Sequence, residues 1–268
     1  MEYQHIQVSR EERLMILTID RPQVMNALAP QTHAEMDHAF NAFAADDELW
    51  AAIVTGSGDT AFCAGGDIAA MQKAAAAGDA SLYAIPASGY GGLTSRFDCH
   101  KPIIAAVNGL ALGGGFEIVL ACDLAVASDK ASFGLPEPLI GALAVAGGMH
   151  RLIRQVGNKR ALAMLMTGDS IDAGRALDYG LVNSVVPAGE LMAAARKLAQ
   201  RVLRCSPMAV RASKQVALQG LDYPGLEAAI RAQDAGEYSE MQRWMGGSDA
   251  REGIDAFIEK RRPVWKNR

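Results

Sequence analysis

Short apolar segments alternate with amphipathic ones through the first half of this 268-residue chain. Four of these segments have the length and aliphatic content of buried strands, namely 13–19, 51–55, 102–107 and 124–127. Between the first two, residues 30–45 open with a proline and repeat apolar side chains at helical spacing. Buried strands that alternate with helices are typical of parallel β-crossovers, so the sequence predicts an α/β fold.

The pattern changes after about residue 148, where helical periodicity takes over. Helices are predicted at 149–167, 172–179, 190–204, 207–219, 225–245 and 249–260, with one short strand at 182–186. We therefore predict an α/β core over residues 1–200 and a helical region over residues 201–268. Residues 73–92 are rich in Ala, Gly and Ser, which is typical of a loop or a frayed helix.

Composition argues against several classes of protein. Half of the residues are hydrophobic, enough for a sizeable core, and the formal net charge of −4 provides no general attraction for nucleic acid or anionic membranes. Neither a signal-peptide pattern nor an apolar run of about 18 residues occurs in the sequence. The four cysteines are scattered, as expected of free thiols in a reducing cytosol, and we predict a cytoplasmic protein.

Motifs for metal or nucleotide binding are missing or weak. The five histidines lack the spacing of metal ligands, so no metal is expected. His33 and His38 fall on the predicted helix 30–45, where we expect both to face solvent. Gly56–Ser57–Gly58 follows a strand, as in a dinucleotide-binding fingerprint, but another glycine turn follows it instead of a helix.

Two glycine-rich turns each follow a predicted strand and precede a predicted helix. They are FCAGGD at 62–67 and GLALGGGFE at 109–117. Glycine allows the backbone to approach a ligand closely and to point N–H groups at it. Two such N–H groups that converge on one oxygen would form an oxyanion hole, which the helix N-termini would strengthen. The glycines alone are equally compatible with two tight turns that have no chemical role.

Two glutamates lie in unusually apolar surroundings. Glu117 stands in the helical stretch Gly-Phe-Glu-Ile-Val-Leu, and Glu137 is flanked by Pro136 and Pro138. Carboxyl groups in apolar surroundings can hold different protonation states, one acting as an acid and the other as a base. The alternative for each glutamate is a structural salt bridge or a helix cap. Their combination with two glycine turns favours a catalytic role.

Taken together, these segments resemble the crotonase family, also called the enoyl-CoA hydratase/isomerase superfamily. The matching segments are 21–22, 26–28, 62–67, 101–123, 131–137, 146–152 and 252–265. They span nearly the whole chain in the family's order. The resemblance implies a spiral of repeated ββα units, followed by a C-terminal helical region that builds trimers. Members similar to this chain commonly pair two trimers into a hexamer.

The resemblance also assigns roles in a reaction. Gly66 and Gly114 match the two N–H donors of the family's oxyanion hole, and Glu117 and Glu137 match the two glutamates that hold water. Members that only isomerise a double bond usually keep one of these glutamates. Retention of both implies hydration of trans-2-enoyl-CoA to 3-hydroxyacyl-CoA, or the reverse dehydration. Ionised Glu117 would activate the water that attacks C3, and protonated Glu137 would donate to C2. Coenzyme A is then part of the substrate, and no separate cofactor is implied.

Binding of the CoA moiety is implied for residues of both turns and of the helical region. The positions are Ala64, Gly65, Gly66, Asp67, Ile68, Gly113, Gly114, Phe257 and Lys260. Phe257 and Lys260 are expected to reach a CoA molecule, in some arrangements that of a neighbouring subunit. The alternative for Lys260 is a solvated helix charge. Arg21 is expected either near the phosphates or in a salt bridge of its own turn.

Two departures from the family pattern affect the expected pocket. Ala144–Val145 stands where hydratases carry Pro–Gly, and a β-branched residue there is expected to narrow the pocket. Gln23 replaces a commonly basic residue that meets phosphate. The second glycine turn, the loop after Glu137 and the Pro-Val-Trp-Lys ending are similar to crotonobetainyl-CoA (carnitinyl-CoA) hydratase-like sequences.

Two other functions remain open on the sequence. The first is a different crotonase reaction, such as double-bond isomerisation or C–C cleavage, against which the paired glutamates argue. The second is a non-catalytic binder of CoA esters or of RNA, against which the negative net charge and the retained acids argue.

Overall fold

A computed structural model describes residues 2–268, and its main sheet is mostly parallel. The six-stranded sheet has the order β1 (Ile6–Glu11), β2 (Leu14–Ile19), β3 (Ala51–Gly56), β5 (Ile103–Val107), β7 (Leu124–Ser128) and β10 (Ser184–Val186). Only β1 and β2 pair antiparallel, and each later neighbour pairs parallel. The central strands β3 and β5 are apolar on both faces, which is typical of a parallel sheet with helices on both sides.

A second, smaller sheet carries the two glycine turns. Its order is β4 (Ala61–Cys63), β6 (Leu110–Leu112), β8 (Ser132–Gly134) and β9 (Ile171–Asp172). β4, β6 and β8 are parallel, so their carboxyl ends meet at one edge of the sheet. The loops that leave this edge begin α2 (Ile68–Ala77), α3 (Gly114–Ala121) and the short helical turn Glu137–Ile140.

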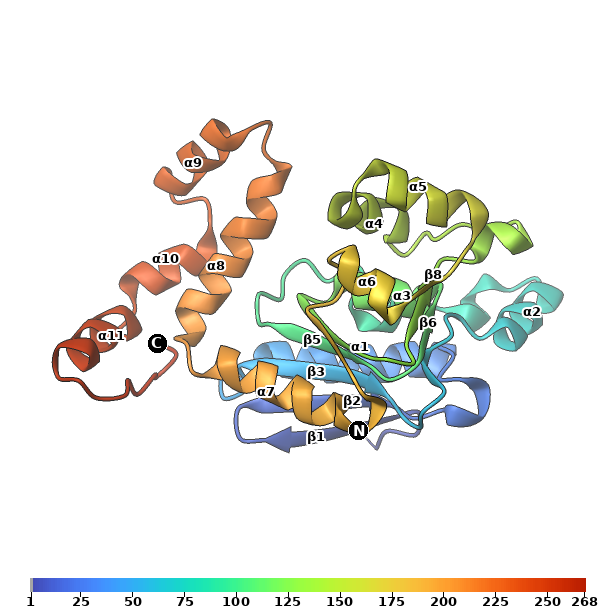
Figure 1. Cartoon of the computed structure of the whole chain (residues 1–268), viewed down its shortest axis with the longest axis horizontal. Helices are drawn as coiled ribbons and strands as arrows, with labels where there is room; N and C mark the ends of the chain where they lie inside the picture. The colour runs from blue at the N-terminus through green and yellow to red at the C-terminus, as the bar shows by residue number, and fades with distance from the viewer. Residues whose placement is uncertain (1) are drawn as a thin grey trace.

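Helices cover both faces of the main sheet (Figure 1). On one face, α7 (Leu191–Leu203) packs against β3, β5 and β7 through Leu191, Ala195 and Ala199. On the other, α1 (Pro30–Ala45) and α3 pack in the larger core. The remaining helices are α4 (Gly148–Val156), α5 (Asn158–Thr167), α6 (Ala173–Asp178), α8 (Pro207–Gln219), α9 (Leu226–Asp234), α10 (Ser239–Gly246) and α11 (Asp249–Ile258).

The mixed α/β prediction is confirmed, with differences that have local causes. The predicted helix 149–167 is two helices, because Gly157 takes φ +78° between them. The predicted helix 225–245 is likewise interrupted after α9, where Gly236 has φ +78°. Strand β1 was not predicted, because its alternating polar residues leave most of its side chains exposed. Residues 73–92 contain the end of α2 and two short helical turns.

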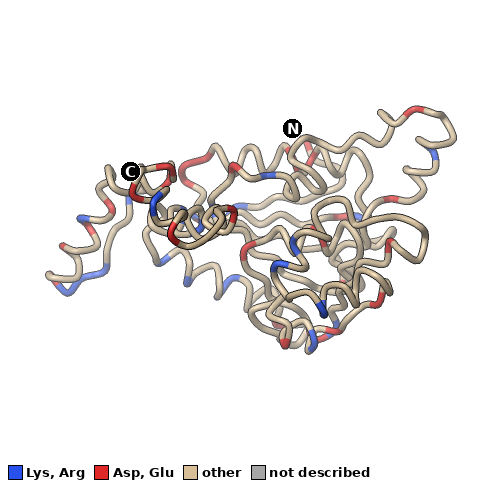
Figure 2. The backbone as a smooth tube through the Cα atoms, turned by 90° about the horizontal axis from the view of Figure 1, so that it is seen from above, with Lys and Arg blue, Asp and Glu red and all other residues tan. Residues whose placement is uncertain are grey.

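Charged side chains of both signs are distributed along the molecule. Figure 2 shows Lys and Arg interspersed with Asp and Glu along the chain. Within residues 2–268, no helix is both long and apolar enough to cross a membrane.

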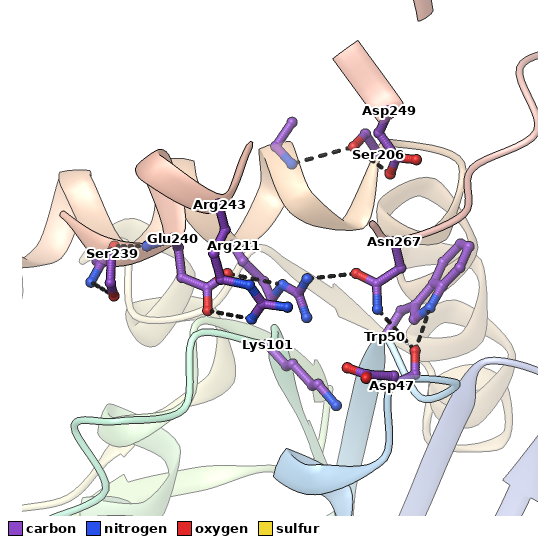
Figure 3. A network of polar contacts seen from close by, with 12 residues as sticks. Asp47, Trp50, Lys101, Ser206, Arg211, Ser239, Glu240, Arg243, Asp249 and Asn267 are labelled. Atoms are coloured by element: carbon purple, nitrogen blue, oxygen red, sulfur yellow. Dashed lines mark hydrogen bonds and ion pairs between the residues drawn. The ribbon is translucent and has the colours of Figure 1, made fainter. Parts of the chain in front are cut away.

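The helical C-terminal region extends to one side of the core (Figure 1). Its contacts with the core include a polar network around Arg211 on α8 (Figure 3). Arg211 donates to Asn267 Oδ1 at 2.5 Å, and Asn267 Nδ2 donates to the Asp47 carbonyl at 2.9 Å. Nearby, Lys101 Nζ donates to the carbonyls of Phe43 and Asp46, both at 2.7 Å. The chain's end is therefore tied to the loop after α1, while the boundary near residue 200 stays a prediction.

Asn26 ties the first glycine turn to the main sheet. Its side chain is fully buried, accepts from Arg21 N at 2.9 Å and donates to the carbonyls of Ser57 and Ala61 at 3.0 and 2.7 Å. Two residues later, Leu28 N donates to the Gly65 carbonyl at 2.8 Å. The hydrogen bonds of Asn26 and Leu28 thereby hold the first glycine turn in a fixed position relative to the main sheet.

Replacing Asn26 by alanine is expected to lower the free energy of unfolding by about 2–3 kcal/mol, because buried backbone groups lose their partners. Urea midpoints at one protein concentration measure this change. Asn158→Ala is the control, since Asn158 is exposed at the start of α5. It should change stability by no more than about 0.5 kcal/mol. Equal effects of the two substitutions would contradict the anchoring role of Asn26.

Candidate active site

The two glycine turns lie against each other at the edge of the smaller sheet. The first connects β4 with α2, the second connects β6 with α3, and β4 pairs directly with β6. A methyl group on Gly65 would lie 3.3 Å from Gly114 N and 3.0 Å from the Leu112 carbonyl. Gly65 has φ +97° and Gly113 has φ +52° with ψ −126°. Glycine is thus required at both positions, by backbone conformation and by close approach.

Gly66 N and Gly114 N are free to bind a substrate oxygen. Within residues 2–268, neither N–H donates to a protein acceptor. Gly66 is held by the bridge to Leu28, whose carbonyl accepts from Asp67 N, and Gly114 is the first residue of α3. Unpaired N–H groups at a helix start carry partial positive charge. The structure therefore brings together the two predicted donors on neighbouring turns.

Glu117 lies on the first turn of α3, where only 3% of its surface is exposed. Its Oε1 accepts from Gly148 N, the first residue of α4, at 2.8 Å. Burial raises the pKa of Glu117 to about 7, and the nearby Glu137 carboxyl adds to the rise. The Gly148 N–H and the Arg151 guanidinium oppose it by favouring the carboxylate. Glu117 can therefore exchange a proton near neutral pH.

The carboxyl group of Glu137 lies against the second glycine turn. A methyl group on Gly113 would lie 2.9 Å from Glu137 Oε1. Its Oε2 is buried and has no partner within residues 2–268. Burial raises the pKa of Glu137 as well. Within residues 2–268, neither glutamate takes part in a salt bridge, although the Glu117 contact with Gly148 N does cap the start of α4. One buried and one half-buried carboxyl, both with raised pKa values and beside free N–H donors, are suited to acid–base chemistry.

The raised pKa of Glu117 makes the protein's stability depend on pH. Its folded-state pKa of about 7 lies above the ordinary value of 4.5, so folding favours the protonated form. The resulting contribution of Glu117 to the free energy of unfolding is fully present below pH 4.5 and is lost as pH rises through about 7. Glu117→Gln cannot ionise at this position. Its free energy of unfolding, relative to that of wild type, should therefore increase between about pH 5 and about pH 8.5, by up to about 3 kcal/mol. Thermal unfolding of both proteins tests this, and a difference that does not change with pH would contradict it.

An apolar cavity of about 300 Å³ opens beside the glutamates. It is lined by Leu135, Glu137, Pro138, Leu143, Ala144, Met149, Ile153, Leu162 and Leu165. Ala144 is buried in its wall, whereas the side chain of Val145 is 72% exposed. The expectation that the β-branched residue narrows the pocket is therefore wrong, because Val145 points outward and the small Ala144 faces the cavity.

Aromatic residues that the sequence did not single out cover the glycine turns. A methyl group on Gly66 would lie 2.8 Å from Tyr83 Oη and 3.2 Å from Tyr90 Oη, and one on Gly114 would lie 2.5 Å from the Tyr90 ring. His33 packs edge-on against both rings and accepts from Gly91 N at 3.1 Å. The expectation that His33 faces solvent is wrong, because it is fully buried beneath Tyr90, whereas His38 is exposed. Burial lowers the pKa of His33 to about 4, so it stays neutral.

The other predicted CoA-binding residues are not all brought together. Asp67 caps α2 by accepting from Ala70 N at 3.1 Å, and it pairs with Arg21 at 3.0 Å. This pair supports the salt-bridge alternative for Arg21. Ala64 donates to the Met25 carbonyl, and the exposed Ile68 begins α2. Phe257, on α11, and Lys260, just after it, lie at the opposite end of the molecule from α2 (Figure 1). Their predicted contact with CoA would therefore have to involve another subunit.

Similarity to known proteins decides the family. The family model described as enoyl-CoA hydratase/isomerase matches residues 9–268. The chain belongs to this family. An enzyme of the hydro-lyase type, as predicted, is confirmed at the level of the family.

Relatives of this enoyl-CoA hydratase/isomerase family member match it over nearly their whole length. Carnitinyl-CoA dehydratase of Proteus mirabilis is 40% identical over 265 residues, covering 99% of each chain. That of Citrobacter koseri is 42% identical over 260 residues, covering 97% of each chain. Among solved structures, an enoyl-CoA hydratase of Mycobacterium marinum is similar with a TM-score of 0.88 at 34% identity, covering 98% of this chain and 99% of that one. The predicted crotonase-type fold is thus confirmed.

Proposed function

We propose that the protein hydrates trans-2-enoyl-CoA thioesters to 3-hydroxyacyl-CoA thioesters, or catalyses the reverse dehydration. The observation that carries the proposal is the pair of carboxyls, those of buried Glu117 and half-buried Glu137, beside the unpaired N–H groups of Gly66 and Gly114. An isomerase needs one such group to move a proton, whereas addition of water requires that one proton be removed from water and another be delivered to C2.

The geometry suits a simple sequence of bond changes. Gly66 N–H and Gly114 N–H donate to the thioester oxygen and stabilise the negative charge that develops there. Glu117 accepts a proton from water as its oxygen bonds to C3, and electrons move through C2 to the thioester oxygen. Glu137 then delivers a proton to C2, which restores the carbonyl. Water has been added across the double bond, and one proton has passed from Glu137 to the substrate and one from water to Glu117.

Within this proposal, coenzyme A enters as part of the substrate and no other cofactor takes part. Residues 2–268 contain no group of three His, Cys, Asp or Glu side chains arranged to hold a metal ion. The turns around Gly65 and Gly113 would hold the thioester end of the CoA. Phe257 and Lys260 would contact the CoA bound by a neighbouring subunit, which requires an oligomer.

Assembly into trimers, or into hexamers of two trimers, is the corresponding expectation. Large apolar side chains are exposed on the C-terminal helices and the segments that flank them: Leu218, Leu221, Leu226, Ile230, Ile254, Phe257, Ile258 and Val264. Such a concentration of exposed apolar residues is typical of an association surface. Light scattering should give three or six times the mass of the chain. A monomer at micromolar concentration would contradict this assembly and the CoA role of Phe257 and Lys260.

Loss of the conjugated-enoyl absorbance of crotonyl-CoA tests the proposed reaction. We expect the absorbance to fall on addition of enzyme, with 3-hydroxybutyryl-CoA as the product identified by mass spectrometry. Binding of the thioester without loss of absorbance would overturn the proposal. It would shift the assignment to isomerisation or C–C cleavage, and a trans-3-enoyl-CoA would then test isomerisation.

A further inference from the structure

The apolar cavity begins at one of the two proposed catalytic carboxyls. Glu137 forms part of its wall. Ala144, another part of the wall, would lie 3.1 Å from a methyl group on Gly148, the residue whose N–H binds Glu117. The cavity thus adjoins Glu137 directly and reaches Glu117 only through Ala144 and Gly148. If Glu137 acts at C2 as proposed, this cavity is a suitable place for the part of the acyl chain beyond C3.

The lining of the cavity is apolar apart from Glu137. Its other members are leucines, Pro138, Ala144, Met149 and Ile153, from the 135–144 loop, α4 and α5. The lining contains no aromatic ring and no second charge. The ring of Tyr90 lies over Gly114, on the side proposed for the thioester. It is not part of this wall.

A quaternary ammonium group needs a different lining. Proteins bind such cations against aromatic faces or beside carboxylates, and an unpaired charge in apolar surroundings is strongly disfavoured. Glu137 is the one acid in the wall, and in the hydration direction it must carry a proton, so it cannot also serve as a counter-ion to a bound cationic enoyl-CoA. This cavity therefore does not fit the trimethylammonium group that the substrate of a carnitinyl-CoA dehydratase carries.

We propose that this protein selects neutral, apolar acyl tails and discriminates against tails that end in a quaternary ammonium group. The inference rests on the proposed function, because it assigns the tail of that reaction's substrate to the cavity. An engineered cavity of about 150 Å³ can hold benzene, so a cavity of about 300 Å³ has room for a branched or linear tail of about six carbons. The protein would thus differ in substrate from relatives that share about 40% of its sequence.

A matched pair of substrates tests this selectivity. One is crotonobetainyl-CoA, and the other is its tert-butyl isostere, in which carbon replaces the ammonium nitrogen and the shape is kept. We expect kcat/KM for the neutral isostere to exceed that for the cation by at least about 100-fold. Equal values, or a preference for the cation, would overturn the inference. Crotonyl-CoA, which has almost no tail, separates the two claims: its hydration supports the proposed function whichever tail is preferred.

Dissociation constants extend the test to the case in which none of the three thioesters reacts. Calorimetry with the two saturated acyl-CoA analogues should show the same preference for the neutral tail. Tighter or equal binding of the cationic analogue would overturn the inference independently of turnover.

A pair of leucine variants locates the effect in the cavity. Leu162 lines the cavity and is 42% exposed, whereas Leu177, on α6, is 44% exposed and outside the lining. Leu162→Glu is expected to reduce the neutral-over-cationic preference by about 10-fold or more, because a carboxylate now faces the tail. Leu177→Glu should leave the preference unchanged. If the preference in Leu162→Glu equals that of wild type, the tail does not meet this wall and the inference fails.

Discussion

Glutamine in place of Glu117 or Glu137 is expected to lower kcat for crotonyl-CoA hydration by about 10²–10⁴-fold in each case. A glutamine keeps the shape of the side chain and an oxygen that can still accept from Gly148 N in the case of Glu117. It cannot take up or release a proton. KM should change little, because the N–H groups that hold the thioester belong to Gly66 and Gly114.

Another glutamate with a buried carboxyl provides the control for these two variants. Glu35, on α1, is 1% exposed and accepts from Gln4 N and His5 N, near the start of the chain. Glu35→Gln should leave kcat within about a factor of three of wild type, although it removes charge from a buried carboxyl. Turnover of Glu117→Gln and Glu137→Gln at the level of Glu35→Gln would remove both glutamates from the mechanism.

Gly115→Ala is expected to give the second large effect. A methyl group on Gly115 would overlap the Cys63 carbonyl oxygen and would lie 2.7 Å from the Cys63 carbonyl carbon. Both contacts are with the backbone of the neighbouring turn, so no side-chain rotation relieves them. The two turns must move apart, which separates the Gly66 and Gly114 donors. We expect a loss of about 10²–10³-fold in kcat, together with about 1–3 kcal/mol of stability.

Gly189→Ala is the matched control for the glycine substitution. A methyl group at Gly189 meets nothing within 4 Å, and this residue lies before α7, away from both turns. Activity and urea midpoint should remain those of wild type. If Gly115→Ala also kept full activity, a fixed spacing of the two turns would not be needed for the reaction.

Much of the fold follows from local patterns in the sequence. The strands β2, β3, β5 and β7 are continuous apolar runs, and α1 has a proline start with helical spacing, so each was predicted within about two residues. Strands β4, β6 and β8 have three residues each, too short to display a period. The sheet that aligns the two glycine turns therefore became visible only in the structure.

The candidate site was predicted in part, for reasons that differ between residues. Glu117 could be recognised in the sequence as a candidate site residue, because a carboxylate within an apolar helix is costly to bury unless it is paired, neutral or functional. Its environment, however, depends on Gly148 N and Arg151, which lie on α4 and are distant in sequence. Tyr90 and His33 lacked a signal, because a tyrosine in a glycine-rich loop and a histidine on an amphipathic helix are ordinary. The position of Tyr90 over Gly114, and of His33 against Tyr90, depends on how residues 80–92 fold back onto α1.

The most direct test of the account is the hydration rate of crotonyl-CoA by Glu117→Gln, Glu137→Gln and the double variant. If both carboxyls act on one water and one substrate, removal of the second should add little to removal of the first. The account predicts that the double variant retains a kcat close to that of the slower single variant. Losses that multiply would contradict the joint action of Glu117 and Glu137, as would single variants that turn over at nearly the wild-type rate.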